Sequence, residues 1–128
     1  MSDNAPAKGL AVITGASTGI GYELARCAAQ DGYDLVIAAD ESRIAQAADD
    51  LRQVGGAVEA VEADLSTVDG VDRLMERIEA DGRSVDLLMA NAGRGLGKGF
   101  LDQDFAEARK VVDTNVTGTI YLVHQIGN

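Results

Sequence analysis

TGASTGIG occupies residues 14–21, directly after the apolar run LAVI at residues 10–13. Beyond it, apolar residues recur at the three- and four-residue spacing of a helix, namely Ile20, Leu24, Cys27 and Ala28. A strand therefore turns through glycines into a helix. Such a turn lets the backbone approach a pyrophosphate, and the first N–H groups of the helix face the anion, with Ser17 and Thr18 as added hydroxyl donors. The simpler alternative is a turn in which glycine serves geometry alone.

The same order of strand and helix repeats along the chain. Apolar runs at residues 35–39, 58–63 and 85–90 predict three more strands, and a helical pattern follows each of them. Continuous apolar strands that alternate with helices are typical of a parallel sheet covered on both faces. We predict an α/β protein with a Rossmann-type doubly wound parallel sheet. Its four strand–helix units fill residues 9–128, after a flexible tail at residues 1–8.

Each predicted helix carries one apolar stripe that is expected to face the sheet, and Cys27 is expected in the core. Ser66, with Asp69 three residues later, is the expected N-cap of the third helix. Gly55-Gly56 should end the second helix and Gly127 the last. The stripes are Ile44, Ala47, Ala48 and Leu51 in the second helix, Val68, Val71, Met75 and Ile78 in the third, and Phe105, Ala108, Val112, Val116, Ile120 and Val123 in the last.

The composition narrows the class of partner. The 128 residues include 21 acidic and 11 basic ones, and the formal net charge is −10. Because nucleic acids and anionic membranes are bound by clustered Lys and Arg, we expect neither as a partner. The single cysteine and the lack of an apolar run long enough for a signal peptide or membrane span favour a cytoplasmic protein. His124, the only histidine, lies outside any cluster of metal ligands, so no metal site is predicted.

Asp40 is the candidate ligand for a ribose. It ends the second predicted strand, 19 residues after Gly21. In dinucleotide-binding folds an acid about 20 residues beyond the glycine turn receives the ribose hydroxyls. A carboxylate there would repel a 2′-phosphate, so we expect NAD rather than NADP, although Arg43 could soften this preference. The alternative role for Asp40 is a helix N-cap.

These motifs, in this order, resemble the short-chain dehydrogenase/reductase superfamily. The TGxxxGxG signature of that family stands at residues 14–21, its acidic residue after the third strand at Asp64-Leu65, and its NAG at Asn91-Ala92-Gly93. A fourth match is Asn115. The resemblance covers residues 9–124 and implies the N-terminal half of a dinucleotide-binding domain. The cofactor-binding set is then Gly15, Ser17, Thr18, Gly19, Ile20, Gly21, Asp40, Asp64, Leu65, Asn91, Ala92 and Gly93.

The resemblance also implies a role for each matched residue. Asp64 and Leu65 would contact the adenine, and Asn91-Ala92-Gly93 would support the central sheet and pass beside the adenine ribose. Asn115 would belong to the Asn-Ser-Tyr-Lys catalytic set. Each has a structural alternative: Asp64 as a turn residue at a strand end, Asn91 as a loop residue that stabilises a turn, and Asn115 as a polar residue on a helix surface.

The catalytic Ser and Tyr-x-x-x-Lys of the family would follow the fourth unit. None of Tyr22, Tyr33 and Tyr121 has a lysine four residues later. The resemblance implies the NAD(P)-binding portion of an oxidoreductase that transfers hydride between nicotinamide and a carbonyl or alcohol substrate. This chain alone is expected to be inactive. The alternative is a non-catalytic dinucleotide-binding or interaction module.

The strand order implied by the resemblance is 3-2-1-4, which leaves the fourth strand at an edge. An apolar edge at residues 85–89 favours pairing with another chain. In the last helix, Val111, Tyr121 and Leu122 are apolar residues away from the main stripe. We therefore expect a homo-oligomer, or pairing with a C-terminal half.

Overall fold

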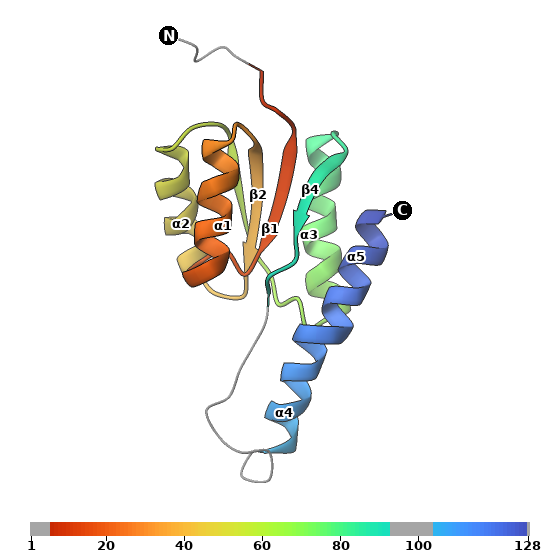
Figure 1. Cartoon of the computed structure of the whole chain (residues 1–128). Coiled ribbons are helices and arrows are strands. Elements are labelled where there is room, and N and C mark those ends of the chain that lie inside the picture. The colour runs from red at the N-terminus through yellow and green to blue at the C-terminus, as the bar shows by residue number, and fades with distance from the viewer. Residues whose placement is uncertain (1–5, 93–103, 128) are drawn as a thin grey trace.

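A computed structural model describes residues 6–92 and 104–127 of the chain. Strands and helices alternate as predicted (Figure 1). The elements are β1 (Leu10–Thr14), α1 (Gly19–Gln30), β2 (Asp34–Ala39), α2 (Arg43–Arg52), β3 (Val58–Glu62), α3 (Val68–Asp81), β4 (Val85–Met89), α4 (Phe105–Val112), the π-helix η3 (Asp113–Gly118) and α5 (Thr119–Gly127).

The four strands form one parallel sheet in the order β3-β2-β1-β4, which confirms the predicted topology. Val12 of β1 pairs with Val36 of β2 on one side and with Leu88 of β4 on the other. β4 is an edge strand within the described part of the chain, and four of its five residues are only half-buried.

Helices cover both faces of the sheet, so the strands are buried on both sides (Figure 1). On one face α1 and α2 pack against alternate strand residues such as Ile13 and Ile37. On the other face α3 and α5 pack against the intervening ones, such as Val12 and Val36. This arrangement explains why the strands read as continuous apolar runs.

The buried face of α1 is made of small residues, and the predicted stripe is wrong in part. Gly21, Ala25, Ala28 and Ala29 are buried, whereas Ile20 and Cys27 are exposed. A Cβ atom on Gly21 would lie 1.9 Å from the carbonyl oxygen of Gly15, so the helix lies close against the turn before it. Cys27 is therefore a surface thiol, not a core residue.

The start of α3 also differs from the prediction. Thr67, not Ser66, is the N-cap, and its Oγ1 accepts a hydrogen bond from the Gly70 amide at 2.9 Å. The buried face is Gly70, Val71, Leu74 and Ile78, while Val68 is exposed. The helix begins one residue later than the cap signal indicated, and Leu74 takes the place expected for Met75.

Residues 105–127 form one continuous helix through α4, η3 and α5, which we call the C-terminal helix. Its predicted apolar stripe is wrong, because the described side chains of that stripe are exposed. The buried face is instead Thr114, Gly118 and Leu122. We call the outward residues the exposed stripe; its members are Phe105, Val112, Val116, Ile120 and Val123.

A close contact explains the orientation of the C-terminal helix. A Cβ atom on Gly118 would lie 1.7 Å from the carbonyl oxygen of Leu65, so only glycine lets the helix approach the loop after β3. Leu122 joins the core beside α3, and the Tyr121 hydroxyl donates a 2.8 Å hydrogen bond to Asp72, which raises the pKa of the tyrosine. Leu122 and Tyr121, expected on an outer surface, thus serve internal packing. The side chains of Ala108 and Val111 lie outside what the structure describes.

The end of the predicted tail is bonded to the body. The Lys8 amide donates to the carbonyl of Gly32 at 2.8 Å, and its ammonium pairs with Asp31 at 2.9 Å. Within residues 6–92 and 104–127, no helix is long and apolar enough to cross a membrane.

Candidate functional site

A cleft of about 320 Å³ opens at the carboxyl ends of the strands. In parallel sheets ligands bind outside this edge, at the point where the strand order reverses, which here lies between β1 and β4. Its lining residues come from the turns after all four strands and from the C-terminal helix. They are Gly15, Ser17, Thr18, Ala39, Asp40, Glu41, Ala63, Leu65, Asn91, Ala92 and Thr114.

The glycine-rich turn forms one side of the cleft. Gly15 and Gly19 take φ values of 64° and 63°, in the left-handed region that favours glycine. The Thr18 side chain makes no capping bond, and the first turn of α1 carries no acidic residue. The N–H groups at the start of α1 lie at the positive end of the helix dipole, which suits an anion.

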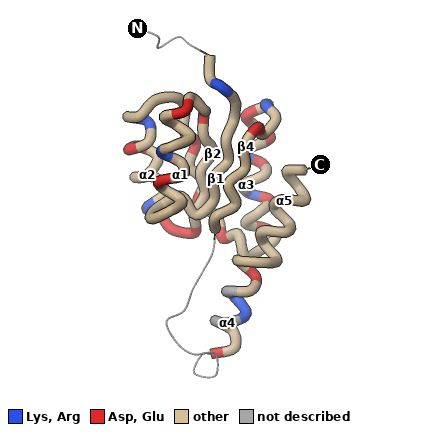
Figure 2. Tube along the Cα trace, in the orientation of Figure 1, with Lys and Arg blue, Asp and Glu red and all other residues tan. Residues whose placement is uncertain are grey.

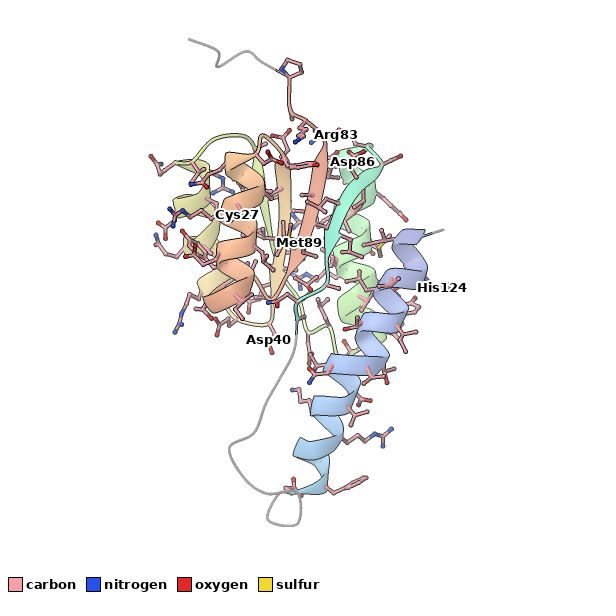
Figure 3. The ribbon with its side chains drawn as sticks, in the orientation of Figure 1. Cys27, Asp40, Arg83, Asp86, Met89 and His124 are labelled. Atoms are coloured by element: carbon pink, nitrogen blue, oxygen red, sulfur yellow. The ribbon has the colours of Figure 1, made fainter. Side chains whose placement is uncertain are left out.

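The loop after β2 forms an acidic rim. Asp40 is exposed and lines the cleft, at the opposite end of the sheet from Arg83 and Asp86 (Figure 3). Ser42 directly precedes α2 and its side chain makes no capping bond, so the alternative role of Asp40 as a helix N-cap stays a prediction. Glu41 adds a second carboxylate: its Oε1 accepts a 2.7 Å hydrogen bond from the Ser17 hydroxyl and lies 4.0 Å from Nε of Arg43.

The Ser17–Glu41 bond was not predicted from the sequence. It ties the glycine-rich turn to the loop after β2 across a separation of 24 residues. Acidic and basic side chains are otherwise spread over the helices and loops, whereas the strands that form the centre of the sheet are largely uncharged (Figure 2). The charge at the cleft is therefore set by its rim.

The turn after β3 carries Asp64 and Leu65. Asp64 Oδ1 accepts hydrogen bonds from the Ser66 amide at 3.0 Å and the Ser66 hydroxyl at 2.6 Å, and Oδ2 lies 3.7 Å from Nζ of Lys110. Asp64 thus bonds within its own turn, as its structural alternative predicted, while its contact with an adenine stays a prediction. Leu65 is buried and contributes an apolar wall to the cleft.

Thr14 joins the ends of β1 and β4. Its Oγ1 accepts hydrogen bonds from the amides of Asn91 and Ala92, both at 2.9 Å. The Asn91 side chain in turn donates to the carbonyl of Gly15 at 3.5 Å. Sequence reasoning missed Thr14 as a structural group of the site; the only signal was a hydroxyl residue at the end of an apolar strand. Gly93 lies outside the described residues.

Asn115 lies in the π-helix η3 and is exposed. Short π-helical segments inside α-helices occur frequently at functional sites. Its neighbour Thr114 is buried and lines the cleft, and Thr119 Oγ1 donates to the Thr114 carbonyl at 3.2 Å. Sequence reasoning selected Asn115 and missed Thr114.

The cleft brings together seven of the predicted cofactor-binding residues. These are Gly15, Ser17, Thr18, Asp40, Leu65, Asn91 and Ala92. Gly19, Ile20, Gly21, Asp64 and Asn115 are not among its lining residues. Among residues 6–92 and 104–127, no group of three His, Cys, Asp or Glu side chains is arranged to hold a metal ion.

Comparisons with known proteins point to one family. Its profile, described as short chain dehydrogenase, matches residues 9–127. The cis-4-hydroxycyclohexanecarboxylate dehydrogenase of Sinomonas cyclohexanicum is 38% identical over 117 residues, which are 88% of this chain and 45% of that protein. The NADP-dependent mannitol dehydrogenase of Alternaria alternata is 31% identical over 121 residues, or 91% of this chain and 46% of that protein.

A solved structure shows the same arrangement of elements. L-Sorbose reductase from Gluconobacter frateurii, crystallised with NADPH and L-sorbose, matches with a TM-score of 0.85 at 29% identity. The match covers 95% of this chain and 47% of that one. The chain thus spans about half the length of the relatives it matches.

Proposed function

This chain belongs to the short-chain dehydrogenase/reductase family, and on that premise we propose that its cleft binds a nicotinamide dinucleotide by the adenosine and pyrophosphate portion. The observation that carries the proposal is the arrangement at the carboxyl ends of the strands. An uncapped helix N-terminus, a carboxylate rim and an apolar wall meet around one cleft. These groups suit a pyrophosphate, a ribose and a purine ring respectively.

The rim supports a preference for NAD over NADP. A 2′-phosphate bound beside the carboxylates of Asp40 and Glu41 would add negative charge to this rim, and like charges at short distance repel. Two matched proteins are described with NADP or NADPH, so the preference rests on the rim of this chain and not on its relatives. Arg43, 4.0 Å from Glu41, is held toward that carboxylate.

Calorimetric titration tests the dinucleotide site. The chain should bind NAD⁺ more tightly than NADP⁺, and Asp40→Ala should weaken NADH binding about tenfold, the equivalent of about 1.4 kcal/mol. Asp49→Ala, which removes an exposed acid from α2, is the matched control and should leave binding unchanged. Equal affinity of Asp40→Ala and wild type would remove Asp40 from the ribose site.

For the whole protein we propose hydride transfer between the nicotinamide and a carbonyl or alcohol carbon, with Asn115 as a member of the catalytic set. When bound, the nicotinamide would accept or donate the hydride. A general acid or base of the protein would donate or accept the proton. The family motif for that acid, Tyr-x-x-x-Lys, is not in these 128 residues. The chain alone should therefore not reduce NAD⁺ in the presence of alcohols, which an assay on material of verified mass would check.

A second candidate is a non-catalytic module that binds the dinucleotide and a partner chain. Two observations favour an interaction surface: the half-buried edge of β4, beside a shallow groove lined by Cys27 and Met89, and the exposed stripe of the C-terminal helix. Figure 3 places Cys27 and Met89 on facing elements, α1 and β4. Recovery of oxidoreductase activity on addition of a C-terminal half would favour the first candidate, and binding without recovery the second.

We further propose self-association through these surfaces.

We also propose a cytoplasmic location. The location rests on the single cysteine, Cys27, which is a free thiol at the surface. Exposed thiols persist in reducing compartments. Fractionation of cells that produce the protein would test the location.

A further inference from the structure

The sequence contains three Asp–Gly pairs, namely Asp31-Gly32, Asp69-Gly70 and Asp81-Gly82. An aspartate rearranges most readily before glycine, because glycine has no Cβ to hinder its amide nitrogen. That nitrogen attacks Cγ of the aspartate, and the carboxyl OH leaves with the amide proton as water, which closes a succinimide ring. Water then adds back to either carbonyl of the ring and gives aspartate or isoaspartate. The reaction needs neither an oxidant nor a cofactor.

Asp69 is held inside a helix. It lies in the first turn of α3, where the Gly70 amide donates a 2.9 Å hydrogen bond to Oγ1 of Thr67. Gly70 is also buried against the carbonyl of Asp64. The nitrogen that would attack Asp69 is therefore bonded and enclosed, and the first turn of α3 would have to unwind before the ring could close.

Asp81 ends α3, and Arg83 holds its carboxylate through both oxygens. Nε of Arg83 donates to Oδ1 at 2.7 Å, and Nη2 donates to Oδ2 at 2.9 Å. The side chain of Asp81 is 23% exposed, and the hydrogen bond from Arg83 lowers the pKa of its carboxyl. While these bonds last, Cγ is not free to turn toward the Gly82 nitrogen, and the ionised carboxyl is the poorer electrophile.

Asp31 lies at a similar position with less to hold it. It is the C-cap of α1, and Gly32 has a φ of 98°, comparable with 84° at Gly82. The Asp31 side chain is 62% exposed and pairs with the Lys8 ammonium, which is itself 53% exposed. Such surface pairs contribute little free energy. The Gly32 amide donates to Ala29 at 3.1 Å, in a last helical turn that opens more easily than a helix interior.

We propose that Asp31-Gly32 is a site of isoaspartate formation in the folded chain, and that their contacts protect Asp69 and Asp81 from the same reaction. Isoaspartate adds a methylene group to the backbone between α1 and β2 and takes it from the side chain, so the carboxylate moves away from Lys8. Asp31 is also the charged residue among those that line the shallow groove beside β4. The reaction therefore changes the charge arrangement of that groove and creates a substrate for protein isoaspartyl methyltransferases.

Peptide mapping of the whole chain, aged at neutral pH, tests the proposal. Trypsin leaves the three Asp–Gly pairs in separate peptides, because arginines lie between them, and isoaspartyl methyltransferase labels the isoaspartate in each. Asp31 should gain isoaspartate several-fold faster than Asp69 or Asp81. In concentrated urea the three rates should become similar, since glycine follows each aspartate.

Two results of this comparison would overturn the proposal. If Asp31 gains isoaspartate in buffer no faster than Asp81, the contacts of Asp81 give no protection. If Asp31 leads by the same factor in urea as in buffer, the local sequence and not the fold selects it.

Variants test the cause of the protection. Arg83→Gln should raise the rate at Asp81 several-fold and leave the rate at Asp31 unchanged. Arg73→Gln, at an exposed position of α3, is the matched control and should leave Asp81 protected. Asp31→Glu should remove the signal from its peptide, because glutamate would have to close a larger ring. An unchanged rate at Asp81 in Arg83→Gln would contradict the role given to its contacts.

Discussion

The helix α2 and the C-terminal helix carry equally clear apolar stripes, yet the stripe of α2 is buried and that of the C-terminal helix is exposed. The stripe of α2, which is Ile44, Ala47, Ala48 and Leu51, is buried against the sheet as predicted. The stripe of the C-terminal helix faces outward, with Phe105 72% and Ile120 64% exposed. Its buried line, Thr114, Gly118 and Leu122, contains a single large apolar residue.

The difference shows that one face of a helix can pack against its own chain while a separate apolar face stays exposed. Among the described residues, the main contacts of α2 are with β2, β3 and α1, so its one apolar face is its core face. The C-terminal helix packs against α3 and the loop after β3 through small residues, which permit close approach. Contiguous apolar surface that remains outside is typical of an interface.

The largest expected effect tests the core assignment of α2. Leu51→Ala removes a fully buried side chain and should lower the free energy of unfolding by about 2–5 kcal/mol. Val116→Ala, in the exposed stripe, should change it by no more than about 0.5 kcal/mol in the monomer. Urea denaturation at low protein concentration measures both. Equal losses would mean that the two stripes do not differ.

A smaller effect is expected where the C-terminal helix meets the loop after β3. Gly118→Ala places a methyl group into the carbonyl of Leu65 and should cost about 1–3 kcal/mol, because the helix must shift. Gly127→Ala is the control, since nothing lies within 4 Å of its Cβ position and alanine favours helix. If both variants denature at the same urea concentration, the close contact does not hold the helix.

The exposed stripe itself should affect association more than folding. The double variant Val116→Asp/Ile120→Asp should weaken self-association about tenfold or more, at about 1.4 kcal/mol for each factor of ten, because it places charge in an apolar contact. Its denaturation midpoint at low concentration should match wild type. Light scattering over a range of concentrations measures the effect. A wild-type chain that remains monomeric at high concentration would contradict the proposed interface.

The smallest effect lies at the far end of the sheet from the cleft. Arg83 bonds Asp81 and reaches Asp34 at 3.0 Å, and its hydrogen bond lowers the pKa of the Asp81 carboxyl. A lowered carboxyl pKa stabilises the fold above the ordinary value of 3.8, and this contribution is lost as pH falls through the lowered value. Since the pair is partly exposed, we expect about 0.5 kcal/mol.

Arg83→Gln should remove that contribution at neutral pH, and its stability should converge with that of wild type in strong acid. Arg73→Gln, at an exposed position of α3, is the control and should follow the wild-type curve throughout. Denaturation midpoints measured from pH 7 to pH 2 compare the three proteins. A constant difference across that range would show that the pairing with Asp81 is not the cause.

The sheet could be predicted from the sequence because its strands are continuous apolar runs, each bounded by polar residues or glycine. The strand order came from the family resemblance and agrees with the structure. The buried faces of α1, α3 and the C-terminal helix could not be predicted by choosing the largest apolar residues. At each of them a glycine, Gly21, Gly70 or Gly118, meets a carbonyl oxygen of a turn, and periodicity of size does not reveal such contacts.

The outline of the candidate site could also be predicted from the sequence. Residues at strand ends, such as Asp40 and Asn91, could be placed because parallel strands bring their carboxyl ends together. Partners that join two distant segments were missed: Thr14 with Asn91, Ser17 with Glu41, and Lys110 with Asp64. The packing of the elements decides which distant residues become partners, so no local sequence pattern reveals these pairs.

The single oxygen atom at the side chain of Thr14 has a wider consequence. Where two parallel strands end, the amides that follow one strand lose the carbonyl acceptors of the other. Leaving such amides unpaired costs free energy. Here the two amides that follow β4 both bond to this oxygen, so neither of them is left unpaired where the strand pair ends. The turns after β1 and β4, which both line the cleft, are thereby joined by a single side-chain oxygen.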